Sequence, residues 1–224
     1  MEKVTSADGT TIAFERSGEG DPLIIVGGAL SDRETHRSLA AELPDHTVII
    51  YDRRGRGDSS DTAPYLVERE VEDLAALIET LGTAAVYGHE SGASLVLRAA
   101  ADGLPINAAI LHNAPLGPND EESTQQVTTL LATGRHAEAA ARFRGTPSNA
   151  HTLLYDFAVM SHPDPKELAS AVRCPTLVVV DETTDAYKDF AHALPHGRHA
   201  VLHNEEALAP VVHEFLGSYR PERT

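Results

Sequence analysis

The chain has 224 residues and a mass of 24.0 kDa, which suits one domain with a modest insertion and leaves too little sequence for two independent cores. Apolar residues make up 42% of it, and no apolar run approaches the roughly 20 residues that span a bilayer, so we expect a soluble globular protein. The 18 basic and 34 acidic residues give a net charge of −16, which disfavours nucleic acid and anionic lipid as partners.

The cysteine content and the first residues bear on the compartment. Cys174 is the single cysteine, so no internal disulfide can form. The opening residues 1–15 contain neither a long apolar core nor a basic flank, unlike a signal peptide. We therefore expect a cytoplasmic protein.

The N-terminal half predicts a hairpin followed by alternating strands and helices. Asp8-Gly9 suits a tight turn between two short runs rich in β-branched and aromatic residues, within residues 4–15. Beyond it, short β-branched runs alternate with helical patterns, typical of buried strands joined by crossover helices. These elements are strands at 22–26, 46–52 and 84–88 and helices at 32–44, 67–82 and 91–103.

The same alternation continues to the C-terminus. Strands are predicted at 106–114, 174–181 and 201–203, and helices at 186–195 and 206–217. This order predicts an α/β fold with a mainly parallel twisted sheet and helices on both faces. Residues of about 116–172, which are helical and rich in proline and glycine, are too long for a simple crossover and are expected to form a reduced helical lid on a single domain, 1–224.

A strand-to-helix turn carries the most informative motif, Gly-His-Glu-Ser-Gly at 88–92. Here the chain resembles the α/β-hydrolase family, whose G-x-S-x-G elbow places a strained nucleophile above the sheet. The run IIVGGALSD at 24–32 is similar to the family's oxyanion loop, and YDRRGRGDS at 51–59 to its Arg-Gly-x-Gly turn. The resemblance covers nearly the whole chain and implies the α/β-hydrolase fold.

The chain departs from the family at the centre of the elbow, where Glu90 replaces serine. A carboxylate attacking an acyl carbon would give an anhydride, so ordinary serine-esterase chemistry is not expected. Glu90 can instead act as a nucleophile that opens an epoxide or displaces halide, or as a general base in isomerisation, elimination or cyclisation. The hypothesis is an enzyme acting on an uncharged or weakly polar small molecule, without a cofactor.

Two other interpretations stay open. The chain can be a non-hydrolytic isomerase, cyclase or epimerase, or an inactive member of the fold that binds a ligand or a partner. A one-residue slip that makes Ser91 the nucleophile would require glycine at positions 89 and 93, where His89 and Ala93 stand. We expect Ser91 to cap the first turn of its helix.

The resemblance implies further site residues. It places the catalytic histidine at His203 and its acid at Asp185, with Asp181 and Glu182 as alternatives after the same strand. It also implies that the backbone of Gly28, Ala29 and Ser91 holds developing negative charge.

The remaining candidates concern the pocket and its surroundings. His89, Tyr155 and Met160 are expected to line the substrate pocket. The short lid suggests either a more open site or one that a second copy completes in a homodimer. The spacing of His196, His199 and His203 does not support a metal site, because no carboxylate or cysteine accompanies it. Arg53 and Arg54 are expected to be structural residues of their turn.

Overall fold

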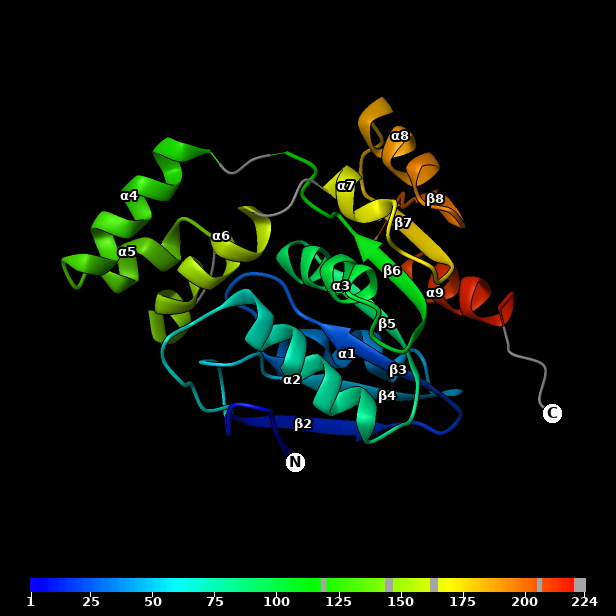
Figure 1. Cartoon of the computed structure of the whole chain (residues 1–224), viewed down its shortest axis with the longest axis horizontal. Helices are drawn as coiled ribbons and strands as arrows, with labels where there is room; N and C mark the ends of the chain where they lie inside the picture. Colours follow the sequence, from blue (N-terminus) through cyan, green and yellow to red (C-terminus); the bar gives the residue numbers. More distant parts are fainter. Residues whose placement is uncertain (118–119, 144–146, 162–164, 205–206, 220–224) are drawn as a thin grey trace.

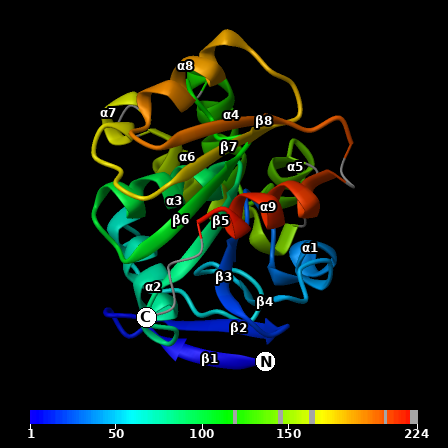
Figure 2. The same ribbon diagram turned by 90° about the vertical axis from the view of Figure 1, so that its right-hand side faces the viewer.

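The computed structural model describes residues 1–117, 120–143, 147–161, 165–204 and 207–219. An eight-stranded sheet with the order β1-β2-β4-β3-β5-β6-β7-β8 forms its centre (Figure 2). β2 pairs antiparallel with β1 and β4, and the pairs from β4 to β8 are parallel. The sequence predicted this mainly parallel sheet with an N-terminal hairpin. Its strands are β1 (Glu2–Thr5), β2 (Thr11–Ser17), β3 (Asp21–Val26), β4 (His46–Tyr51), β5 (Ala84–His89), β6 (Ile106–His112), β7 (Thr176–Val180) and β8 (Gly197–Val201).

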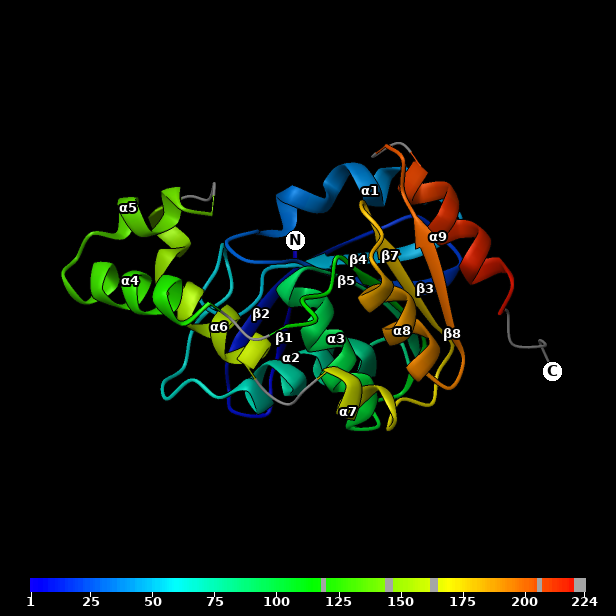
Figure 3. The ribbon, with the colours of Figure 1, turned by 90° about the horizontal axis from the view of Figure 1, so that it is seen from above.

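Helices cover both faces of the sheet, as the βαβ alternation predicted (Figure 3). One face packs against α2 (Val67–Glu79), α3 (Ser91–Ala101) and α8 (Asp185–Ala193). The other packs against α1 (Arg37–Ala41) and α9 (Leu208–Gly217). The central strands are buried on both sides, so their side chains form two apolar cores.

The first helices of the segment between β6 and β7 extend beyond the sheet, and its last helix returns to lie beside α3 and α8 (Figure 1). The segment contains α4 (Glu121–Ala132), α5 (His136–Ala141), the 3-10 helix η2 (Pro147–Thr152), α6 (Leu153–Ser161) and α7 (Pro165–Ala169). Within the expected lid, 116–172, positions 118–119, 144–146 and 162–164 lie outside the described residues. A third apolar cluster joins α4, α5 and α6 to Ala29 and Leu30, so this lid packs directly onto the loop that follows β3.

Most predicted elements differ from the observed ones by one or more residues at an end, and three of these differences are as follows. The helix expected at 32–44 is a 3-10 turn, η1 (Arg33–His36), followed by the short α1, because Asp32 caps a tight turn at Thr35. The last strand runs over 197–201 instead of 201–203, since its polar first residues pair with β7 at the sheet edge. The helix expected at 206–217 is seen from Leu208, and position 206 lies outside the described residues. Within the described ranges, no helix has the length and apolarity needed to cross a bilayer.

Candidate functional site

The turn between β5 and α3 holds Glu90 in a strained backbone conformation, with φ 49° and ψ −119°. Both flanking glycines are needed for this turn. A β-carbon on Gly88 would lie 2.5 Å from the carbonyl oxygen of Gly92, and one on Gly92 would lie 2.5 Å from that of Val26. The tight approach leaves the Glu90 side chain exposed at the carboxyl end of the sheet.

The Glu90 carboxylate faces the loop after β3. A β-carbon on Gly28 would lie 3.1 Å from Glu90 Oε2, and the Glu90 backbone N–H donates to the His112 carbonyl at 2.9 Å. Among the described residues, no hydrogen bond or ion pair engages the carboxylate itself. An unpaired carboxylate at this position can attack a carbon atom or accept a proton.

The loop after β3 presents its carbonyl oxygens to arginine side chains. Arg56 Nη1 donates to the Gly28 carbonyl at 2.6 Å, and Arg53 Nη1 donates to the Gly27 carbonyl at 3.2 Å. Ser31 Oγ also donates to the Gly28 carbonyl, at 2.7 Å. The backbone N–H of Ala29, a predicted oxyanion donor, has no acceptor in the described part of the chain.

The structure does not bring the predicted histidine and acid together. Asp185 begins α8, is almost fully exposed and accepts a hydrogen bond from Lys188 at 3.2 Å. His203 follows β8 and is exposed. No contact among the described residues joins His203 to Asp185 or to Glu90, so the role assigned to His203 stays a prediction.

A different histidine, His112, meets an acid beside the elbow. Its Nε2 lies 3.1 Å from Asp181 Oδ1, and its Nδ1 lies 2.6 Å from the Tyr87 hydroxyl. Since an ionised carboxylate only accepts, His112 donates from Nε2, and its Nδ1 accepts a hydrogen bond from the Tyr87 hydroxyl. Burial alone would raise the pKa of Asp181, but hydrogen bonds from Asn113 and His112 hold it below its ordinary value. Asp181 was one of three candidate acids, whereas sequence reasoning missed His112.

Part of the signal for His112 was present in the sequence, where this histidine lies near the end of the predicted strand 106–114. His89 and His112 end neighbouring parallel strands, and the register pairs them directly. Side chains alternate between faces along a strand, so Tyr87 and His89 share a face. Because loops at the carboxyl ends of parallel strands form most sites in α/β folds, a histidine that ends a buried strand is a candidate.

Three imidazoles line a cavity of about 450 Å³ on this face. The His89 ring centroid lies 5.0 Å from that of His112 and 6.3 Å from that of His36. Burial lowers the pKa of His36 to about 4, and burial also lowers that of His89, although the Glu90 carboxylate acts in the opposite direction. Both rings are therefore uncharged at neutral pH and can accept a proton.

The other pocket candidates lie apart from this cavity. Tyr155 stacks on Tyr65 with ring centroids 3.8 Å apart, and its hydroxyl donates to Asp61 at 2.7 Å. Met160 packs in the lid cluster with Ala29. Met160 is thus near the oxyanion loop, whereas the contacts of Tyr155 with Tyr65 and Asp61 hold it against the loop before α2.

Ser91 does not cap its helix, contrary to expectation. Its hydroxyl donates to Asp156 Oδ1 at 2.7 Å, and its side chain is buried. Arg53 and Arg56 bind the same carboxylate, and Arg53 also pairs with Glu70. Within this buried cluster the Ser91 hydroxyl is occupied, so the cluster offers no support for Ser91 as a nucleophile.

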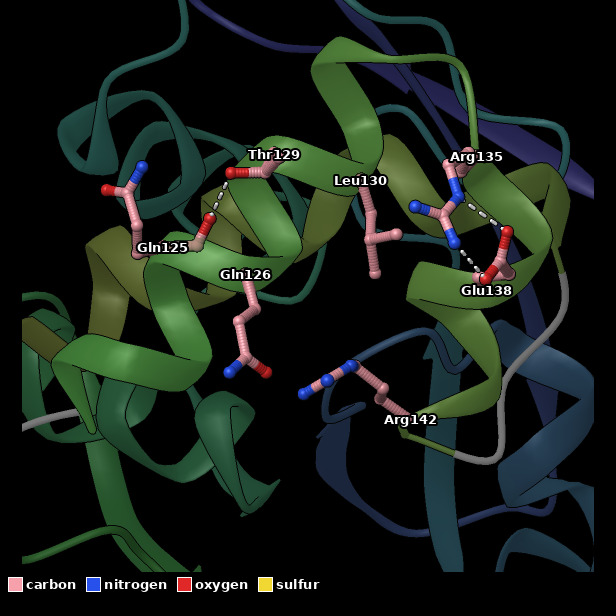
Figure 4. A pocket seen from close by; sticks show the side chains of 7 residues that line it. All are labelled: Gln125, Gln126, Thr129, Leu130, Arg135, Glu138 and Arg142. Carbon is pink, nitrogen blue, oxygen red and sulfur yellow. Dashed lines mark hydrogen bonds and ion pairs between the residues drawn. The ribbon is translucent and has the colours of Figure 1, made fainter.

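The lid carries a second hollow, shown in Figure 4, of about 430 Å³ on α4 and α5. Arg135 pairs there with Glu138 at 2.5 Å, and more than half of each side chain is exposed. None of the predicted site residues lines it. Among the described residues, no group of three histidine, cysteine or acidic side chains is placed to hold a metal ion.

Comparison with known proteins gives a consistent result. The sequence pattern of the alpha/beta hydrolase family matches residues 23–221. A curated protein of Mycobacterium tuberculosis, named as a non-heme bromoperoxidase, is 33% identical over 87 residues. That match spans 37% of this chain and only 33% of the relative.

Solved structures match over almost the whole chain. An alpha/beta hydrolase from Sphaerobacter thermophilus is 40% identical, with a TM-score of 0.88, and the match covers 96% of this chain and 100% of that one. An esterase from Thermogutta terrifontis is 22% identical, with a TM-score of 0.80 over 98% and 99% of the two chains. An enol-lactonase from Burkholderia xenovorans is 19% identical, with a TM-score of 0.76 over 96% and 100%. The last two show likeness of fold.

Proposed function

Because the chain belongs to the α/β-hydrolase family, we propose that it is an enzyme acting on a small organic molecule through the Glu90 carboxylate. One observation carries the proposal. Glu90 occupies the strained elbow with an exposed carboxylate that no described side chain binds. A residue held in a costly conformation with a free reactive group is typical of a site of chemistry.

Two reactions fit this carboxylate. As a nucleophile, Glu90 attacks an epoxide carbon, one carbon–oxygen bond of the ring breaks, and the ring oxygen, still attached to the substrate, takes a proton from water. Water then cleaves the resulting alkyl ester at its carbonyl carbon and regenerates the carboxylate. As a general base, Glu90 removes a proton from carbon or a hydroxyl group, and no bond forms between protein and substrate.

The histidine cavity lies beside the elbow: Glu90 itself does not line it, but the neighbouring His89 does. His89 and His112 adjoin the elbow, and the uncharged His89 ring can activate water or exchange a proton with substrate. Asp181 fixes the tautomer of His112 by accepting a hydrogen bond from its Nε2. We therefore assign acid–base assistance to His89. His112, whose two ring nitrogens are both hydrogen-bonded, and Asp181, in place of Asp185, are positioning residues beside it.

Glu90→Gln tests the proposal with Glu79→Gln as its control, since Glu79 is an exposed glutamate at the end of α2. A panel of epoxides, alkyl halides and enol lactones is screened for turnover. We expect Glu90→Gln to lower kcat by about a hundredfold or more and Glu79→Gln to leave it unchanged. Equal turnover by wild type and Glu90→Gln would refute the role of the carboxylate.

A single turnover in ¹⁸O-labelled water separates the two reactions. A nucleophilic Glu90 gives its own oxygen to the product and acquires ¹⁸O, which mass spectrometry of the peptide detects. A general base acquires no label.

The separation of His203 from Asp185 favours one further candidate, a member of the fold that binds its ligand without turnover. Saturable ligand binding with no product from any substrate in the panel would favour this candidate.

A further inference from the structure

Asp156 lies on the lid helix α6, yet its carboxylate is fully buried among residues of the sheet domain. It accepts hydrogen bonds from Ser91 Oγ and Arg53 Nη1, both at 2.7 Å, and from Arg56 Nη2 at 2.9 and 2.8 Å. These partners stand 65 to 103 residues away in sequence. Burial alone would raise the pKa of Asp156, but Arg56 and Arg53 keep it ionised by lowering the pKa below its usual range.

The same two arginines hold the loop beneath Glu90. Arg56 donates to the Gly28 carbonyl, so Asp156, Arg56 and Gly28 form one continuous chain of hydrogen bonds. In a trans peptide the carbonyl and the following N–H point in opposite directions. The Gly28 carbonyl faces the arginine, and the Ala29 N–H therefore points away from the buried cluster.

The second donor is tied to the same carboxylate. Ser91 is the first residue of α3, where a backbone N–H has no partner within its own helix. Its hydroxyl is fixed by Asp156 and also receives a hydrogen bond from Arg53 at 3.4 Å. The N–H groups of Ala29 and Ser91 both lack an acceptor among the described residues.

We propose that Asp156 is a positioning residue through which the lid aims the Ala29 and Ser91 N–H groups at the Glu90 site. The lid is then part of the anion-stabilising machinery as well as a cover. The apolar cluster of the lid also restrains the loop after β3, because the cluster packs on Ala29 and Leu30. The inference rests on the proposed function for its catalytic meaning, while the geometry it predicts can be measured without a substrate.

Asp156→Asn tests the inference, and Asp73→Asn is the matched control. Asp73 is equally buried and binds Arg54 through two hydrogen bonds at 2.7 Å, but it does not contact Gly27, Gly28 or Ser91. Backbone ¹⁵N relaxation gives the order parameters of the Ala29 and Ser91 amides in each protein. We expect both to fall from about 0.85 toward about 0.6 in Asp156→Asn and to stay unchanged in Asp73→Asn.

Arg56→Lys carries the test if Asp156→Asn does not fold. A lysine keeps the charge beside Asp156 but cannot reproduce the planar fork of the guanidinium, so Ala29 should loosen while Ser91 stays ordered. The inference would be overturned if the order parameters of Ala29 and Ser91 stayed at the wild-type value in Asp156→Asn, or if that of Ala29 did so in Arg56→Lys. An equal fall in the control Asp73→Asn would also overturn it.

Kinetics supply a second readout once a substrate is found. Asp156→Asn should lower kcat by about a hundredfold with little change in KM, because the donors act on charge that develops in the transition state. Absence of turnover in the wild type would count against the proposed function and leave the amide measurements as the test of the positioning role.

Discussion

The strained backbone at Glu90 leads to a prediction about stability. With φ 49° and ψ −119°, the residue lies in a sparsely populated region that costs a non-glycine residue roughly 1–3 kcal/mol. Glycine removes this strain but loses about 0.5–1 kcal/mol through the entropy of the unfolded chain. Since the Glu90 side chain is exposed and unpaired, Glu90→Gly should be more stable than Glu90→Ala by about 1 kcal/mol.

Urea denaturation of the two variants measures this difference. Ala75→Gly, within α2, is the control and should lose about 1 kcal/mol, as glycine does in an ordinary helix. The reasoning is refuted if Glu90→Gly is no more stable than Glu90→Ala, because the elbow would then store no strain. A gain in stability together with lost turnover would identify strain as the energetic cost of presenting the carboxylate.

Three further predictions follow from buried groups. Leu74 is fully buried, so Leu74→Ala should lower the free energy of unfolding, measured by urea denaturation, by about 2–5 kcal/mol. The control Leu66→Ala, at an exposed position, should lower it by less than about 0.5 kcal/mol. Similar losses in the two variants would contradict the core assignment. Burial lowers the pKa of His36 to about 4, so as the pH falls the unfolded chain binds a proton at this histidine before the folded chain does. The free energy of unfolding should therefore fall by about 3 kcal/mol between about pH 6.5 and about pH 4. His36→Gln should flatten this slope, and an unchanged slope would contradict the prediction. Asp181→Asn should lower kcat at least about tenfold and change the ¹⁵N shifts of His112 in NMR, and intact shifts would exclude the tautomer assignment.

The sequence allowed the sheet and the elbow to be predicted because both depend on local patterns. Glycine is required at positions 88 and 92 by close backbone approach, and short β-branched runs specify buried strands. The last strand was harder to predict from the sequence, since the polar residues that begin β8 do not resemble a buried strand. Ser91 had a plausible local role as a cap, and a contact 65 residues away replaced it.

The side-chain partners of the site depend on long-range packing. Asp156 looks like any polar residue of an amphipathic helix until the lid folds against Arg53, 103 residues away. Asp185 matched the family offset, yet α8 starts at that residue and directs it to Lys188. Only the strand register shows that His112 stands beside His89.

Hydrolysis of p-nitrophenyl acetate by the wild type and by Glu90→Ser tests the central claim, that a carboxylate stands at an otherwise assembled elbow. We predict no hydrolysis above the buffer rate by the wild type, because a carboxylate at this position gives no ordinary acyl-enzyme. From Glu90→Ser we predict a burst of p-nitrophenol. A wild type that hydrolyses the ester as fast as Glu90→Ser, or faster, would contradict the account and move the nucleophile away from position 90.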